Sequence, residues 1–150
     1  MPTSTVRADL RAGLVTILQA FTVANPTSLL ATYAARPESL LQPMPFAYVE
    51  LGQEATAFSN GVRHRTYAPG IVVVQRYTTN AQVIAEQDAR IDLLVEHMTG
   101  YPQIITGSIW SNLTVSDEIA ELGTDASGQP TYAAATRITF ADFDKGEGRV

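Results

Sequence analysis

The dipeptide Asn60-Gly61 is the feature that most restricts how this chain can fold, because of what stands on either side of it. Residues 54–58 and 62–68 are two short runs of alternating character. Asn-Gly between two such runs is the strongest short signal for a β-hairpin, since both residues tolerate the positive φ of a tight turn. Pro69-Gly70 marks a further turn directly afterwards. The centre of the sequence therefore predicts antiparallel strands.

Strands are also predicted on both sides of this hairpin. Phe46 to Leu51 alternates and stops at Gly52. The run from Ile71 to Thr78 is strongly β-branched, which is typical of a strand at the centre of a sheet.

The end of the chain returns to β-structure. Residues 113–122 and 131–143 predict two strands joined by a polar loop rich in turn-forming residues. In the second of these strands we expect Ile138 and Phe140 to point inward. Residues 144–150 are mostly charged and contain two glycines, and we expect them to form a flexible tail.

Two helices are predicted, one on either side of the central strands. Apolar residues recur at helical spacing over residues 5–23, and Asn25-Pro26 ends this helix. The apolar positions are Val6, Leu10, Leu14, Ile17, Leu18 and Phe21. The second helix follows a capping box from Thr79 to Gln82 and runs to about Met98. Its expected buried stripe is Ile84, Gln87, Ile91, Leu94, Val95 and Met98.

Residues 27–45 are compatible with a short helix at 28–35 or with an extended arm. Three prolines favour an irregular, extended path for the second half: Pro37, Pro43 and Pro45. Strands that follow one another without alternating helices indicate an α+β fold. We therefore expect a single domain over residues 1–150, with an antiparallel β-sheet of about five to six strands packed against two main helices.

Composition and motifs restrict the function. The chain has no cysteine, which excludes disulfides, thiolate nucleophiles and zinc sites built on Cys. Its formal net charge of -5 argues against a broad basic surface for nucleic acid. We expect no secretory signal and no membrane span, because no apolar run approaches roughly 20 residues. No dinucleotide motif, P-loop or catalytic triad can be nominated. We expect no catalytic residue, no cofactor and no metal site.

The two histidines, His64 and His97, offer no site of their own. His97 stands near the end of a predicted helix, where a cation is favourable. His64 stands between two arginines on a predicted strand. Neither has the spacing of a metal motif or an identifiable partner, so we expect structural roles for both.

Two groups of charged residues are candidates for a subunit or tube interface. The acidic group is a row at helical spacing: Asp88, Asp92 and Glu96. The basic group stands on neighbouring strand runs: Arg63, Arg65 and Arg76. Hard-cation sites usually need ligands from several elements, so we expect the acidic row to be a solvated helix edge or to meet arginines of another chain. Three interpretations of the arginines stay open, namely a contact with that row on a neighbouring subunit, a contact with a phosphate backbone, and a solvated sheet face.

The chain resembles the tail terminator, or tail completion, proteins of long-tailed bacteriophages, from the first helix to Phe143. The segments that carry the resemblance are the helix ending near Phe21, the stretch TYAARPESLL, PMPFAYVELG over residues 43–52, a hairpin, the strand IVVVQRYT, a helix beginning near Ala81 and the final RITFADF. They match in length and order, and none is a catalytic signature.

This resemblance implies a structural role in the virion. Such proteins form a homo-hexameric ring that caps the tail tube, ends polymerisation of the major tail tube protein and presents a surface to the head-side connector protein. DNA only passes through the channel, and no membrane is involved. The resemblance implies a place at the head-proximal end of the tail, after assembly in the host cytoplasm, and supplies no catalytic residue.

Two alternatives remain from the sequence. The first is another head–tail connector or neck protein. The second is a small ligand-binding or catalytic α+β domain with tyrosines around a pocket; the candidates are Tyr33, Tyr48, Tyr67 and Tyr77. A concave apolar pocket with converging polar groups would favour the second alternative.

Overall fold

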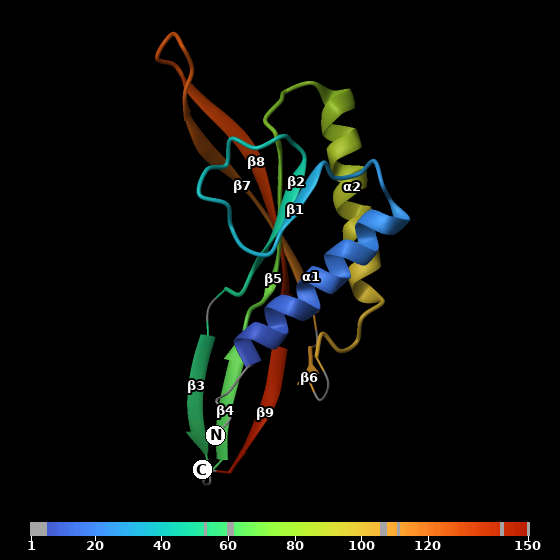
Figure 1. Cartoon of the computed structure of the whole chain (residues 1–150), viewed down its shortest axis with the longest axis vertical. Helices are drawn as coiled ribbons and strands as arrows, with labels where there is room; N and C mark the ends of the chain where they lie inside the picture. Colours follow the sequence, from blue (N-terminus) through green and yellow to red (C-terminus); the bar gives the residue numbers. More distant parts are fainter. Residues whose placement is uncertain are drawn as a thin grey trace.

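A computed structural model describes residues 6–52, 54–59, 62–105, 108–110, 112–141 and 143–149. Its two helices are α1 (Val6–Ala24) and α2 (Ala81–Thr99). Its strands are β1 (Ala31–Tyr33), β2 (Phe46–Glu50), β3 (Glu54–Ser59), β4 (Val62–Tyr67), β5 (Gly70–Arg76), β6 (Ser108–Ile109), β7 (Asn112–Thr124), β8 (Pro130–Ala141) and β9 (Phe143–Arg149). Five strands form one sheet in the order β1-β2-β5-β8-β7, and four form a second in the order β3-β4-β9-β6. The second sheet lies at one end of the long axis (Figure 1).

The predicted α+β fold is confirmed, with a sheet packed against two helices. In the five-stranded sheet β1 is parallel to β2, and every other neighbouring pair is antiparallel. The strand predicted to be central is β5, which lies between β2 and β8. The second sheet is an addition to the prediction. Its hairpin pairs Ser59 with Val62, as the Asn-Gly signal indicates, although the two turn residues lie outside the described part.

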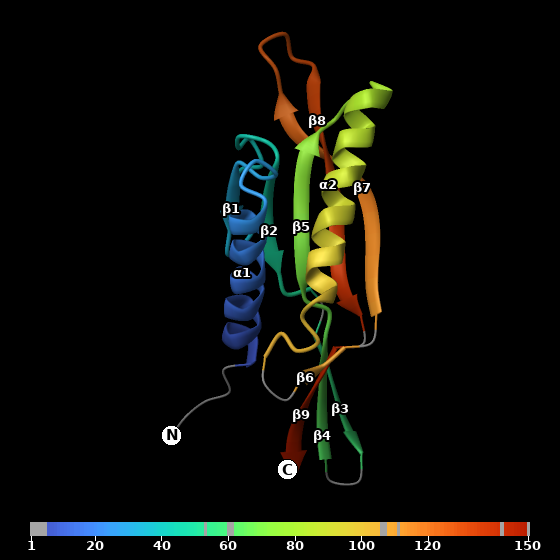
Figure 2. The same cartoon turned by 90° about the vertical axis from the view of Figure 1, so that its right-hand side faces the viewer.

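Both helices cover the same face of the five-stranded sheet (Figure 2). Leu10, Leu14 and Phe21 of α1 and Leu94 and Met98 of α2 are completely buried there. Ile138 and Phe140 of β8 are also completely buried in this core, as predicted. Burial of such side chains stabilises the fold by roughly 1.5–3 kcal/mol each, so this helix–sheet layer carries most of the stability.

Residues 34–45, here called the arm, cover the opposite face of the sheet. Leu40 and Met44 of the arm pack on a second apolar cluster that includes Phe46 and Tyr48 of β2. Before the arm, residues 31–33 form the short strand β1 rather than a helix. Of the two conformations compatible with the sequence, the extended one is found.

The start of α2 differs from the prediction in two details. Asn80, and not Thr79, is the N-cap, because its Oδ1 accepts hydrogen bonds from the backbone N–H groups of Gln82 and Val83. Asparagine is a stronger N-cap than threonine, which explains the shift by one residue. Ile84, predicted to be buried, is 38% exposed because it lies over a groove rather than over packed sheet.

The end of the chain also differs from the expected flexible tail. Phe143–Arg149 forms β9, which pairs with β4 on one side and β6 on the other. The polar composition of residues 144–149 predicts little burial, but backbone hydrogen bonds to an otherwise unpaired strand need no apolar side chains. Those bonds explain why a strand forms where the side chains predict none.

Candidate subunit interface

One side of the molecule, formed by α2 and β7, is acidic. The sequence-predicted row of Asp88, Asp92 and Glu96 is exposed on α2. Strand β7 carries three carboxylates and no basic residue: Asp117, Glu118 and Glu121. It has 13 residues and stands at the edge of the sheet, with β8 as its neighbour. A long exposed edge offers unpaired backbone groups to another chain.

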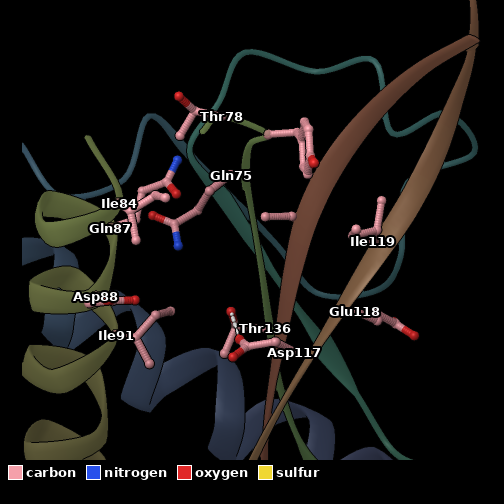
Figure 3. Close-up of a pocket in the computed structure, with 12 residues that line it drawn as sticks. Gln75, Thr78, Ile84, Gln87, Asp88, Ile91, Asp117, Glu118, Ile119 and Thr136 are labelled. Carbon is pink, nitrogen blue, oxygen red and sulfur yellow. Dashed lines mark hydrogen bonds between the residues drawn. The ribbon is translucent and has the colours of Figure 1, made fainter. Parts of the chain in front are cut away.

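A groove of about 260 Å³ lies between α2 and the strands β5, β8 and β7 (Figure 3). Asp88 of α2 and Asp117 of β7 line it from facing elements. The apolar residues on its wall are Tyr77, Ile84, Ile91, Ile119 and Ala134. Its remaining lining residues are Gln75, Thr78, Gln87, Glu118 and Thr136, so no basic side chain lines it. The groove therefore combines apolar surface with uncompensated negative charge.

The two carboxylates of the groove differ in how they are held. Thr136 Oγ1 donates a hydrogen bond to Asp117 Oδ1 at 2.7 Å, which fixes that side chain (Figure 3). Asp88 extends from α2 across the opening toward the sheet (Figure 3). No described cation forms an ion pair with Asp88 or Asp117. A group that carries positive charge on an apolar stem would complement both features.

Glu118 also lines the groove, but its charge is already paired on the other face of the sheet. Arg137 donates to Glu118 Oε1 at 2.8 Å, and to Glu50 at 2.6 Å from Nε and 3.1 Å from Nη2. The hydrogen bonds to Glu50 are the main reason that the pKa of Arg137 is raised. The acidic character of the groove therefore comes from Asp88 and Asp117.

The opposite side of the molecule, formed by α1, β1 and the arm, carries arginines. Arg7 Nη1 lies 3.0 Å from Glu54 Oε2, and Arg11 Nη1 donates to the carbonyl oxygen of Ala34 at 2.5 Å. Arg36 of the arm is exposed and forms no side-chain hydrogen bond or ion pair with the residues that the structure describes. Figure 2 shows α1 and β1 at one edge of the molecule and β7 at the other.

Among the described residues, nine of the ten exposed large apolar side chains lie on these same two sides, and the tenth is Phe58 of β3 in the second sheet. On the side of α1, β1 and the arm they are Val23, Leu30 and Leu41. On the side of α2 and β7 they are Tyr77, Ile84, Leu93, Val115, Ile119 and Tyr132. Contiguous exposed apolar surface is characteristic of interaction sites, so these two sides are the candidates for one.

The three sequence-predicted arginines do not share one surface. Arg63 and Arg65 lie on β4 in the second sheet, and their side chains are outside the described part. Arg76 is the last residue of β5 in the first sheet, and its side chain is exposed. Because β4 and β5 follow one another along the long axis (Figure 2), Arg63 and Arg76 are separated by roughly 40 Å of extended chain.

The tyrosines expected for a ligand pocket fall in separate places. Tyr33 and Tyr48 pack under the arm, whereas Tyr67 lies in the core beneath the helices. Of the four, Tyr77 alone lines the groove. The structure therefore does not bring these tyrosines together around one ligand.

The described histidine, His97, is part of the helix packing. Its Nε2 lies 3.0 Å from the carbonyl oxygen of Ile17, and its ring stacks edge-on against Phe21 with centroids 5.5 Å apart. These contacts join α2 to α1. They agree with the structural role expected from the sequence.

No group of three or more metal-ligating side chains occurs among the described residues. Neither helix within those ranges is long and apolar enough to cross a bilayer.

No family model matches the chain, and no curated protein matches it in sequence. Among the solved structures similar in fold is a chain from the virion of a native gene transfer agent particle, with a TM-score of 0.49 and 13% identity. The match covers 91% of this chain and 98% of that chain. At this level of identity no residue role is transferred.

Proposed function

We propose that this chain is a virion structural subunit that assembles head to tail into a closed ring capping the tail tube. The observation that carries the proposal is the complementarity of its two opposite sides. One side bears exposed arginine and apolar residues on α1 and the arm, and the other bears uncompensated carboxylates and apolar residues on α2 and β7. Such a subunit acts through assembly rather than through catalysis.

Complementary but different surfaces favour a head-to-tail contact over a two-fold dimer. In a two-fold contact through β7, the carboxylates of that strand would face the same carboxylates of the partner, which destabilises the pairing. A head-to-tail contact repeats and either closes into a ring or continues as a filament. A ring of six subunits is the closure that the resemblance to tail terminators implies.

The partners proposed for the ring follow from this assignment. One face would bind the major tail tube protein and end its polymerisation, and the other would bind the head-side connector protein. DNA would pass through the channel without being retained, because a chain with net charge -5 lacks the cations that binding by counterion release requires. The virion position proposed is the head-proximal end of the tail.

The first experiment is the mass of the purified chain in solution. Light scattering over a range of concentrations, with negative-stain electron microscopy of the same sample, should show a closed ring of about six subunits. A protein that stays monomeric at every concentration, both alone and with purified tail tubes, would contradict the proposal.

A neck protein elsewhere in the head–tail junction is the nearest alternative. A tail terminator co-purifies with the tail tube, whereas another connector co-purifies with the portal. Loss of a tail terminator should also leave tubes of uncontrolled length in electron micrographs. Tubes of normal length in its absence would assign the ring to another position in the neck.

A further inference from the structure

We propose that the groove between α2 and β7 binds the arm of an adjacent copy of this chain, with Arg36 of that copy placed between Asp88 and Asp117. The inference rests on the ring assembly proposed above, and it identifies the two surfaces through which neighbouring subunits of that ring would bind one another. The occupant is a second copy of the chain rather than a small molecule. The argument uses the chemistry of the groove, the chemistry of the arm and their positions in the molecule.

The groove selects for a cation with an apolar stem. Its two uncompensated carboxylates, Asp88 and Asp117, stand on facing elements, so a guanidinium group between them can donate to both. Ile84 and Ile119 are 38% and 63% exposed at its walls. Arginine buries its methylene groups on such surface while its charged end is hydrogen-bonded.

On the side of the molecule opposite β7, Arg36 of the arm is the arginine that is available to bind in the groove of a neighbour. Arg7 is paired with Glu54, and Arg11 is bonded to the carbonyl oxygen of Ala34. Arg137 is bonded to two glutamates on the sheet face beneath the arm. Arg36 is exposed without such a partner in the described part of the chain, and Leu41 of the same arm is 64% exposed.

The groove extends from the central strand β5 to the edge strand β7, whereas the arm begins after β1 at the other edge of the sheet and ends with Met44 and Pro45 close to Gln75 and Gln87. Figure 2 shows the arm beside β1 and β2 at the level of the first turns of α2. The groove is lined by residues of those same turns, including Ile84 and Asp88. A neighbour related by rotation about an axis parallel to the long axis, as in a ring, can therefore present its arm to the groove without a shift along that axis.

Glu38 sets a restriction on how the arm binds. It stands two residues from Arg36 and would be repelled by the carboxylates of the groove. We therefore expect it to remain outside the groove. Replacement of Glu38 by Gln should strengthen assembly, whereas replacement of Arg36 by Ala should weaken it.

Site-specific cross-linking tests the contact directly, because the chain has no cysteine of its own. Ala35→Cys places a thiol beside Arg36, and Ile84→Cys places one in the groove. Ala85→Cys is the matched control, since Ala85 is exposed on α2 but does not line the groove. Equal mixtures of the Ala35→Cys variant with each α2 variant are treated with a short bis-maleimide and separated under denaturing conditions.

The expected result is a cross-linked dimer from the Ala35→Cys and Ile84→Cys mixture, at a yield several times that of the Ala85→Cys mixture. A chain carrying both Ala35→Cys and Ile84→Cys should give a ladder that ends at the ring size. Equal yields in the two mixtures, or no dimer in a sample where microscopy shows rings, would overturn the arm–groove contact and leave the proposed function standing. The absence of both rings and dimers, with the chain alone and with purified tail tubes, would overturn both.

The concentration at which assembly is half complete provides a second measurement. Arg36→Ala and the pair Asp88→Asn with Asp117→Asn should each raise it at least about tenfold, and combining them should add little. Urea unfolding of the monomer verifies that each variant is folded. Fully additive effects would overturn the contact, as would binding of free L-arginine in the groove without any change in assembly.

Discussion

Arg137 joins carboxylates from two other strands on the sheet face beneath the arm, and this position makes it sensitive to substitution. Arg137→Met leaves Glu50 without its hydrogen-bond donors while Glu50 stays about two-thirds buried, its side chain being 30% exposed. We expect the free energy of unfolding to fall by about 1–3 kcal/mol, measured by urea denaturation. Glu118→Gln is the control, because Glu118 is 51% exposed and such a pair contributes about 0–1 kcal/mol. Equal losses for both variants would contradict this account.

Tyr48 on the same sheet face predicts a loss of stability at high pH. Burial is the main reason that its pKa is raised above the ordinary value of about 10, and the charge of Glu50 adds to the effect. The folded state therefore favours the neutral phenol. This contribution to stability is fully present below about pH 10 and is lost as the pH rises through the raised pKa.

The test compares the wild-type chain with Tyr48→Phe in urea unfolding between about pH 8 and about pH 11.5. The wild type should lose more stability over this window than the variant, since a phenylalanine side chain has no hydroxyl to ionise. Curves that stay parallel throughout would show that Tyr48 does not contribute.

Among the structural elements, α2 provides a test of which residue begins the helix. Asn80→Ala removes the acceptor for two backbone N–H groups, so we expect a loss of about 1 kcal/mol in the free energy of unfolding. Thr79→Ala is the matched control, and it should cost a few tenths of a kcal/mol at most. Thermal or urea unfolding followed by circular dichroism measures both. A larger loss for Thr79→Ala would restore the capping box predicted from the sequence.

The elements that the sequence predicts well are those whose own side chains specify them. The apolar positions of α1 are all buried as predicted, and β5 is central as its β-branched run indicates. Strand β9 is different, because its residues carry no apolar alternation and its stability comes from the backbone of β4. The residue pattern within one segment gives no information about a pairing strand that lies far away in the sequence.

The candidate site shows the same limit. Asp88, Asp92 and Glu96 are recognisable from helical spacing alone, and they are exposed on α2 as that spacing indicates. The groove needs Asp88 and Asp117, which are far apart in sequence and are brought to facing positions only by the pairing of β7 with β8 and of β8 with β5. The alternation within each strand carries no information on that arrangement. The interface itself stays a prediction.

At the scale of the whole molecule, the different charges on the two opposite sides predict that assembly weakens as the salt concentration rises. The Debye length falls from about 10 Å at 0.1 M salt to about 3 Å at 1 M. We therefore expect the ring to dissociate toward monomers as sodium chloride is raised over this range, measured by light scattering at constant protein concentration. Assembly strengthened by salt would instead indicate that the exposed apolar residues dominate the contact.

Two stretches of chain run from one sheet into the other, and they should make the molecule resist stretching along its long axis. Strands β4 and β5 follow one another along the long axis, and so do β8 and β9; β5 pairs with β8 in one sheet and β4 pairs with β9 in the other. Tension along this axis loads all of those backbone hydrogen bonds in shear at once, whereas tension across the sheet would open them one after another. The same two stretches of chain thus act as a stiff tie between the two ends of the molecule.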